Sequence, residues 1–162
     1  MKRNREIAPD LFDAPKPTLL QLQSLGTLNV YFDGGCSPNP GQKYGSYEVW
    51  FYARLVARNY QVPLGHGTNN EAEWEALGLA LDATEKWAEL DGSAANYALR
   101  VETDSKILWY RLTKKNRVHK KYAESSGRMF AYASAVLEKL RRFGSFTVEW
   151  KRRDANVARF GH

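Results

Sequence analysis

The sequence predicts a single α/β domain, and two observations carry that prediction. Three strand-like segments follow one another with short connections, which is typical of an antiparallel meander. After them helices and strands alternate, as they do in sheets that are covered by helices. The length of 162 residues suits one domain, and 43% hydrophobic with 13% aromatic residues suffice to build a core.

Five strands are predicted from runs of apolar, aromatic and β-branched residues. In the first, apolar and polar residues alternate from Leu28 to Asp33, and a glycine- and proline-rich turn follows at residues 34–41. The predicted strands are residues 28–33, 44–57, 58–64, 97–103 and 146–150. The first three are expected to form the meander.

Helical periodicity predicts four helices. The first is long and is expected to end at Asp91-Gly92-Ser93, a sequence that favours the termination of a helix. The fourth is at most a short terminal helix. The predicted helices are residues 71–90, 105–112, 122–143 and 155–160.

Residues 1–26 differ from the rest of the chain. They contain Pro9, Pro15 and Pro17 among scattered charges, and only a few leucines near their end suggest a short helix. We interpret them as a flexible N-terminal arm in front of a domain that spans residues 27–162. A tail that binds a partner is the alternative.

The composition limits the classes of function. The formal net charge of +6 and the pI near 9.4 favour a polyanionic partner, although many basic proteins of this size bind none. Cys36 is the only cysteine, which excludes an intramolecular disulfide and fits a reducing compartment. No apolar run approaches the ~20 residues of a membrane span, and the N-terminus lacks the apolar core of a signal peptide. We therefore expect a cytoplasmic protein without a membrane partner.

Three acidic residues from separate segments are expected to meet at one edge of the sheet. Asp33 and Asp104 each follow a predicted strand, where aspartate also serves as an ordinary turn former. Glu73 heads the inward-facing stripe of its helix, and Glu71 and Glu75 point elsewhere. The stripe consists of Leu77, Ala80, Leu81, Thr84 and Ala88. Such carboxylates would suit Mg²⁺ or Mn²⁺, and a buried glutamate held by backbone donors is the alternative for Glu73.

The segments around these acids resemble the type 1 ribonuclease H family. Residues 31–41 (YFDGGCSPNPG) resemble the family's first strand and turn, and residues 68–73 (TNNEAE) resemble its helix start. Residues 101–105 (VETDS) resemble the strand end that carries a further aspartate of the family. The three segments occur in the family's order and spacing, and the similarity covers about residues 28–150.

This resemblance implies a ribonuclease H-like fold, in which two parallel strands join the meander to give a five-stranded mixed sheet flanked by helices. It implies a monomeric endonuclease that hydrolyses the RNA strand of RNA–DNA hybrids with two Mg²⁺ or Mn²⁺ ions, leaving 5′-phosphate and 3′-hydroxyl ends. The implied catalytic and metal-binding residues are Asp33, Glu73 and Asp104.

The resemblance also implies contacts between this chain and the backbone of the hybrid. The implied contacts are the side chains of Asn39, Thr68 and Asn70 and the backbone amides of Gly34, Gly35 and Cys36. Recognition of 2′-hydroxyl groups would separate RNA from DNA. A helix cap is an equally plain explanation for Thr68, and the two roles are compatible.

A basic segment at residues 114–121 resembles the protrusion with which some family members grip the hybrid. Cations of this kind bind phosphates without distinguishing base sequence, and a solvated charge run is the alternative. Trp109 is expected either to assist there or to belong to the core. The lysines of the segment are Lys114, Lys115, Lys120 and Lys121.

The C-terminal region departs from the family's pattern. If Ala155-Asn156 aligns with the family's Ala-Asp pair, Asn156 holds the fourth catalytic and metal-binding position with a neutral amide. Asp154 is the second candidate, although a helix N-cap explains it. The family's histidine-bearing loop has no clear counterpart; His162 is the one candidate to substitute for it, and a terminal histidine without a role is the alternative. These departures bear on the rate of cleavage and on the preferred metal more than on the type of reaction.

Two competing functions remain. A DNA-directed nuclease on the same fold is disfavoured by the TNN helix start and the NPG turn, since both resemble a surface that contacts hybrids. A non-catalytic module that binds hybrids or structured RNA is disfavoured by the three retained acids and favoured by the missing fourth acid.

Overall fold

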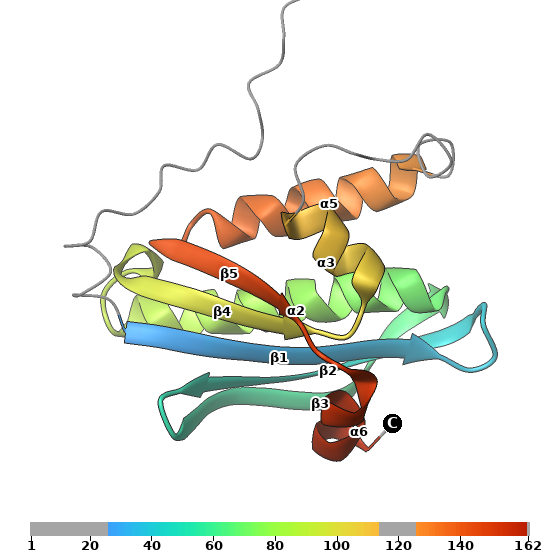
Figure 1. Cartoon of the computed structure of the whole chain (residues 1–162), viewed down its shortest axis with the longest axis horizontal. Helices are drawn as coiled ribbons and strands as arrows, with labels where there is room; N and C mark the ends of the chain where they lie inside the picture. The colour runs from blue at the N-terminus through green and yellow to red at the C-terminus, as the bar shows by residue number, and fades with distance from the viewer. Residues whose placement is uncertain (1–25, 114–125, 162) are drawn as a thin grey trace, which may run out of the picture.

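The computed structural model describes residues 26–113 and 126–161 (Figure 1). Within these residues, no helix combines the length and the apolar character that crossing a bilayer requires. Several sequence predictions lie outside the described residues, namely the arm at residues 1–25, Lys114, Lys115, Lys120, Lys121 and His162.

Five strands form one mixed sheet in the order β3-β2-β1-β4-β5. The first three strands pair antiparallel as a meander, and β4 pairs parallel with β1 and with β5. The predicted fold class is therefore confirmed. The strands are β1 (Gly26–Cys36), β2 (Gly41–Phe51), β3 (Arg54–Gly67), β4 (Tyr97–Thr103) and β5 (Ser145–Trp150).

Helices flank the sheet in the described part of the chain. Buried residues of α2, α3 and α5 share one core with the inward-facing residues of β1 and β4, whereas α6 contacts β1 (Figure 1). The helical elements are α2 (Asn69–Leu90), the 3-10 turn η1 (Ala94–Asn96), α3 (Lys106–Thr113), α5 (Ser126–Leu140) and α6 (Arg153–Phe160).

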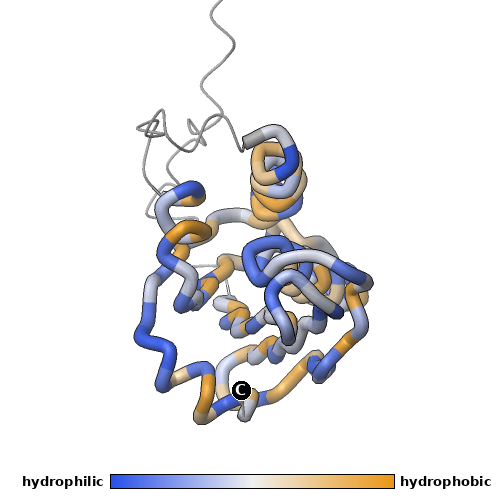
Figure 2. Tube along the Cα trace, turned by 90° about the vertical axis from the view of Figure 1, so that its right-hand side faces the viewer, coloured by the Kyte–Doolittle hydropathy of each residue, from blue (hydrophilic) through white to orange (hydrophobic). Residues whose placement is uncertain are grey.

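The core fixes the orientation of α2 against the sheet. Leu28, Val30 and Phe32 are fully buried on β1 and alternate with half-buried residues of that strand. Figure 2 shows the hydropathy of each residue along the trace. Burial of a leucine-sized side chain contributes about 1.5–3 kcal/mol, so the apolar stripe of α2 decides which face meets the sheet. The predicted stripe is confirmed, because each of its members is 0% exposed: Leu77, Ala80, Leu81, Thr84 and Ala88.

The turn between β2 and β3 lies at Tyr52 and Ala53, and the predicted boundary after residue 57 is wrong. Tyr52 has a φ of 52°, in the left-handed region that favours glycine and asparagine. A tyrosine there gives no turn signal in the sequence. β3 accordingly begins at Arg54 and continues to Gly67, past the predicted end at residue 64.

β1 extends through residues that were predicted to form a turn. Gly34, Gly35 and Cys36 pair with β2 in the same regular register as the rest of β1. The hydrogen-bonded ladder thus overrides the low strand propensity of glycine. Near the other end of the chain, α5 lies inside its predicted range, and α6 begins at Arg153 rather than at residue 155.

Candidate metal centre

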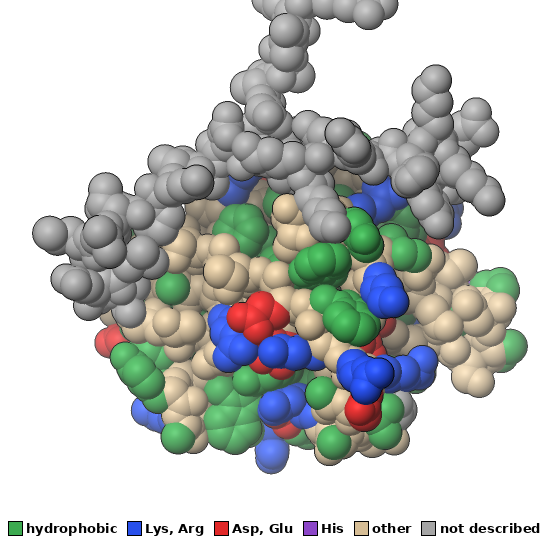
Figure 3. All heavy atoms as spheres, in the orientation of Figure 1, with side chains coloured by type: hydrophobic (Ala, Val, Ile, Leu, Met, Phe, Trp, Pro, Cys, Tyr) green, Lys and Arg blue, Asp and Glu red, His purple; other side chains and the backbone are tan. Residues whose placement is uncertain are grey.

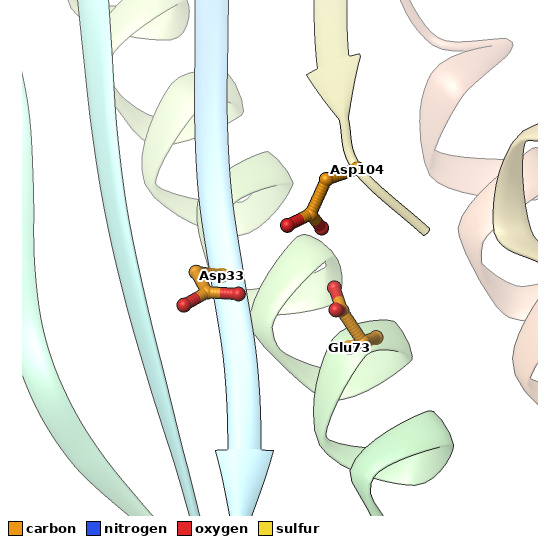
Figure 4. A group of neighbouring side chains, drawn as sticks. All are labelled: Asp33, Glu73 and Asp104. Carbon is orange, nitrogen blue, oxygen red and sulfur yellow. The ribbon is translucent and has the colours of Figure 1, made fainter. Parts of the chain in front are cut away.

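Asp33, Glu73 and Asp104 meet at one end of the sheet, as the sequence predicted (Figure 4). One carboxylate oxygen of each residue lies within 4.8 Å of the others. Because β1 and β4 are parallel neighbours, the aspartates near their carboxyl ends come together. The glutamate reaches them from the N-terminal part of α2.

The start of α2 approaches β1 closely because residue 34 is glycine. A Cβ atom at Gly34 would lie 2.3 Å from the carbonyl carbon and oxygen of Ala72, far inside van der Waals contact. Only glycine leaves room for this approach. The close contact brings the next residue of the helix, Glu73, within reach of Asp33.

The two neighbouring glutamates of α2 have other partners, as predicted. Glu71 forms a capping box with Thr68, which confirms the capping role of this threonine, and an ion pair with Arg128 at 3.0 Å. Glu75 accepts a hydrogen bond from the Lys43 ammonium at 2.6 Å. Of the three glutamates at the helix start, only the one between these two joins the carboxylate cluster.

The Glu73 carboxylate fits a divalent cation. Its Oε2 atom is buried and has no hydrogen-bond partner among the described residues. Backbone donors, the alternative for this residue, therefore do not reach that oxygen. A buried acceptor without a partner costs about 1–3 kcal/mol, and more for a charged group. A cation bound by oxygen ligands removes this cost, and Mg²⁺ and Mn²⁺ prefer such ligands.

Burial and mutual repulsion raise the pKa values of the three carboxyl groups. Burial, followed by the charge of Asp104, raises the pKa of Asp33 from 3.8 to about 6. Burial is also the largest cause at Glu73, whose pKa lies well above its usual range, and at Asp104, whose pKa is raised. The cluster therefore carries its full negative charge at a cost in free energy, which a divalent cation would offset.

An arginine also belongs to this site. Arg153, the first residue of α6, lines the same pocket as the carboxylates, and its charge lowers the pKa of each of them against the effect of burial. This residue was not among the site residues predicted from the sequence. The available signal was its spacing, since it precedes Asn156 by three residues and so shares a helix face with it.

Asn156 lies at the site, whereas Asp154 is exposed. The Nδ2 of Asn156 donates to the Phe32 carbonyl oxygen at 3.3 Å, and its side chain also hydrogen-bonds Asp104 and lowers the pKa of that carboxyl group. A backbone carbonyl only accepts, so the amide nitrogen must face Phe32. Asn156 is thus a donor toward the cluster, and its role as a metal ligand stays a prediction. The N-cap of α6 is Arg152, not Asp154.

A pocket surrounds the carboxylates and includes part of the predicted hybrid-binding set. Gly34, Gly35, Cys36 and Asn70 line it, and Asn39 and Thr68 are not among its described lining residues. Trp109 packs against the core, which was one of its two predicted roles. The lining residues that the sequence analysis missed are Tyr44, Asn69, Ser105 and Arg153.

Asn69 ties the turn after β1 to the start of α2. Its Oδ1 accepts from the backbone N–H of Cys36 at 2.7 Å, and its own N–H donates to the Oδ1 of Asn39 at 3.2 Å. The backbone N–H of Cys36 and the side-chain oxygen of Asn39 therefore already form hydrogen bonds within the protein. Contacts of these residues with nucleic acid stay predictions.

Solved structures with a likeness to this chain have the ribonuclease H fold. The N-terminal RNase H domain of a Mycobacterium tuberculosis protein, fused to maltose-binding protein, has a TM-score of 0.66 at 23% identity, covering 83% of this chain and 95% of that chain. RNase H1 from the halophilic archaeon Halobacterium salinarum has a TM-score of 0.64 at 24% identity, covering 81% and 89%. LC11-RNase H1 in complex with an RNA/DNA hybrid has a TM-score of 0.60 at 20% identity, covering 81% and 89%. The sequence matches no protein-family model and no curated protein with which it was compared.

Proposed function

We propose that this chain is a metal-dependent endonuclease that hydrolyses the RNA strand of RNA–DNA hybrids. The observation that carries the proposal is the convergence of Asp33, Glu73 and Asp104 on a ribonuclease H fold, with a buried glutamate oxygen that has no donor in the described part of the chain. The sequence segments around the three acids support it, because they resemble the type 1 ribonuclease H family in order and spacing. The structural likeness to an enzyme crystallised with an RNA/DNA hybrid supports the choice of substrate.

Asp33, Glu73 and Asp104 would hold two Mg²⁺ or Mn²⁺ ions when the hybrid is bound. When bound, such ions lower the pKa of a water molecule and stabilise the leaving 3′ oxygen. The products would carry 5′-phosphate and 3′-hydroxyl ends. The monomeric state and the cytoplasmic location stay predictions.

The residues of the pocket would position the scissile phosphate. The backbone amides of Gly34 and Gly35 and the side chain of Asn70 lie beside the carboxylates and would contact the nucleic acid backbone. The Arg153 guanidinium would add a positive charge beside the phosphate, where the cluster itself repels an anion. Asn156 would hold the Asp104 carboxylate through its amide nitrogen.

Cleavage assays on matched substrates test this function. An RNA–DNA hybrid, a DNA duplex and an RNA duplex of one sequence are each labelled on either strand and incubated with Mg²⁺, Mn²⁺ or EDTA. We expect metal-dependent internal cuts in the RNA strand of the hybrid only. Cleavage of the DNA duplex would replace the proposal with the DNA-directed nuclease, and binding without cleavage would replace it with the binding module.

Asn156→Ala is expected to lower kcat by about 10-fold, whereas Asp154→Ala should change kcat less than about 2-fold. The reason is that Asn156 is buried and bonded to Phe32 and Asp104, while Asp154 is exposed. Steady-state kinetics on the labelled hybrid measure both. A larger effect of Asp154→Ala would make Asp154 the fourth ligand.

Asn156→Asp distinguishes the two roles of this position. If Asn156 acts as a donor, the carboxylate introduced by Asn156→Asp should repel the Phe32 carbonyl and Asp104. The Mg²⁺ concentration needed for half-maximal activity should then rise. The ligand role that the sequence predicts requires the opposite shift, because a charged oxygen binds the ion more tightly than an amide.

The four lysines of the basic segment are expected to bind phosphates of the hybrid. Replacing Lys114, Lys115, Lys120 and Lys121 with alanine should weaken hybrid binding and flatten its salt dependence by about one unit of slope per lost contact, with kcat nearly unchanged. Fluorescence anisotropy across a salt series measures this slope. Lys86→Ala with Arg141→Ala serves as the control, since both residues are exposed, Lys86 near the end of α2 and Arg141 in the turn after α5. An unchanged slope would make the segment an ordinary solvated surface.

A further inference from the structure

The helix α6 supplies two side chains to the candidate metal centre, although its own sequence favours a helix only weakly. It has eight residues, and its N-cap Arg152 makes no side-chain capping hydrogen bond. Isolated helices of this length do not form in water. Contacts with the sheet must therefore hold α6 in the place where Arg153 and Asn156 reach the carboxylates.

The buried carboxylate of Glu48 on β2 is the centre of these contacts. Its Oε2 accepts from Arg159 Nη1 at 2.7 Å and from Trp50 Nε1 at 2.9 Å, and its Oε1 accepts from the Tyr60 hydroxyl. Only 7% of the Glu48 residue is exposed. Because its three donors come from β2, β3 and α6, this one residue joins these elements. Charge-assisted hydrogen bonds to a desolvated carboxylate are stronger than those at a surface.

Arg159 is also held by an aromatic ring. Its guanidinium carbon lies 3.6 Å from the centre of the Tyr31 ring on β1. The rings of Phe160 and Tyr60 pack edge-on with their centres 6.2 Å apart. The last turn of α6 is therefore fixed both by charge and by stacking.

The register of the sheet connects this contact to the metal centre. Tyr31 is paired with Glu48, and Asp33 with Ser46, in an unbroken β1–β2 ladder. Tyr31 and Asp33 thus lie on the same face of β1, about 6.6 Å apart along the strand. On α6, Arg153, Asn156 and Arg159 follow one another at intervals of three residues, so each lies beside the next on the helix surface, about 4.5 Å further along the axis.

These spacings make the position of Arg159 decisive for the site. With Arg159 seated over Tyr31, the preceding turns of α6 bring Asn156 to Phe32 and Asp104 and bring Arg153 into the pocket. Neither Glu48 nor Arg159 lines that pocket. On the face seen in Figure 3, acidic side chains lie beside Lys and Arg. The charge of Glu48 is balanced by Arg159 in their own ion pair at 2.7 Å.

We propose that Glu48 and Arg159 are positioning residues of the candidate active site, and that their ion pair sets the register of α6 so that Asn156 and Arg153 meet the carboxylates. The catalytic part of this proposal rests on the function proposed above. The structural part concerns the placement of Asn156 and stands independently of that function.

The test compares Arg159→Met with a matched control. Methionine keeps an apolar stem over Tyr31 and removes the ion pair with Glu48. The control is Arg142→Met, because Arg142, in the turn after α5, forms an ion pair of similar length with Glu85 of α2, at 2.9 Å. Thermal unfolding serves to check that both variants fold, and Arg159→Lys is a milder variant that keeps the charge.

The first readout is hydrogen exchange of the Asn156 side-chain amide protons, followed by NMR in the protein without metal or hybrid. We expect exchange at least about 10-fold faster in Arg159→Met, an intermediate rate in Arg159→Lys, and no change in Arg142→Met. Unchanged protection in Arg159→Met would overturn the proposal. Because this readout needs no activity, it remains valid even if the wild-type protein cleaves no hybrid.

The second readout is a double-mutant cycle on kcat. Arg159→Met should lower kcat by about 10-fold with little change in KM, and in an Asn156→Ala background it should lower kcat less than about 2-fold further. Such non-additivity is expected of a residue that acts through Asn156. Equal losses in both backgrounds would overturn the proposal and give the pair a purely structural role.

Discussion

Replacing Asp33, Glu73 or Asp104 with the matching amide is expected to abolish hybrid cleavage, with a loss of at least ~10²-fold in kcat. Each substitution preserves the shape of the side chain and removes one negative charge from the three oxygen ligands. Hybrid binding should persist, because Gly34, Asn70 and the other phosphate contacts proposed above are untouched. Gel-based cleavage at saturating Mg²⁺, beside anisotropy with EDTA, separates the two effects.

Glu89→Gln is the matched control for this series. Glu89 is an exposed glutamate at the far end of the helix that carries Glu73, so the same substitution there should leave kcat unchanged. Full activity of Glu73→Gln would contradict the assignment. It would direct attention to Glu71 and Glu75, whose carboxylates are engaged with Arg128 and Lys43.

The second large effect concerns the stability of the metal-free protein. Asp33→Asn is expected to raise the free energy of unfolding at pH 8 by up to about 3 kcal/mol, which corresponds to a pKa raised from 3.8 to about 6 at a largely buried group. Between these two pKa values the folded protein binds more protons than the unfolded chain. The contribution of Asp33 to stability therefore falls as pH rises from about 4 to 6, and the full penalty is present above pH 6.

Urea unfolding in EDTA at pH 8 and pH 5 measures this effect. The stability gap between Asp33→Asn and the wild type should be largest at pH 8, smaller at pH 5 and absent near pH 4. Excess Mg²⁺ or Mn²⁺ should stabilise the wild type at pH 8 by RT ln(1 + [L]/Kd) and stabilise the variant much less. A variant that is no more stable than the wild type at pH 8 would show that the three carboxylates do not strain the metal-free fold.

The carboxylate cluster was predictable because each of its members stands in a local pattern. The alternation before Asp33 and the strand before Asp104 placed both residues near strand ends, and parallel strands bring such ends together. The apolar stripe of α2 oriented Glu73, since its five buried members leave the helix only one way to face the sheet. Hydrophobic periodicity is a property of the sequence alone, and therefore it carried this information.

The turn at Tyr52 and the strand through Gly34 were not predictable in this way. Local propensity opposes both, and the pairing of β1, β2 and β3 overrides it, because backbone groups inside a sheet must be hydrogen-bonded. Strand pairing joins residues far apart in the chain, so it leaves no local pattern from which a boundary could be derived.

The sequence by itself determined the α/β class, the antiparallel meander and the three acids. Only the tertiary structure decided what α6 contributes, because its position depends on the contact of Arg159 with Glu48 and Tyr31. That contact brings Arg153 to the cluster and turns the nitrogen of Asn156 toward the Phe32 carbonyl. A sequence alignment specifies which residue stands at a position, but the direction of an amide group is fixed by the acceptor that the fold places beside it.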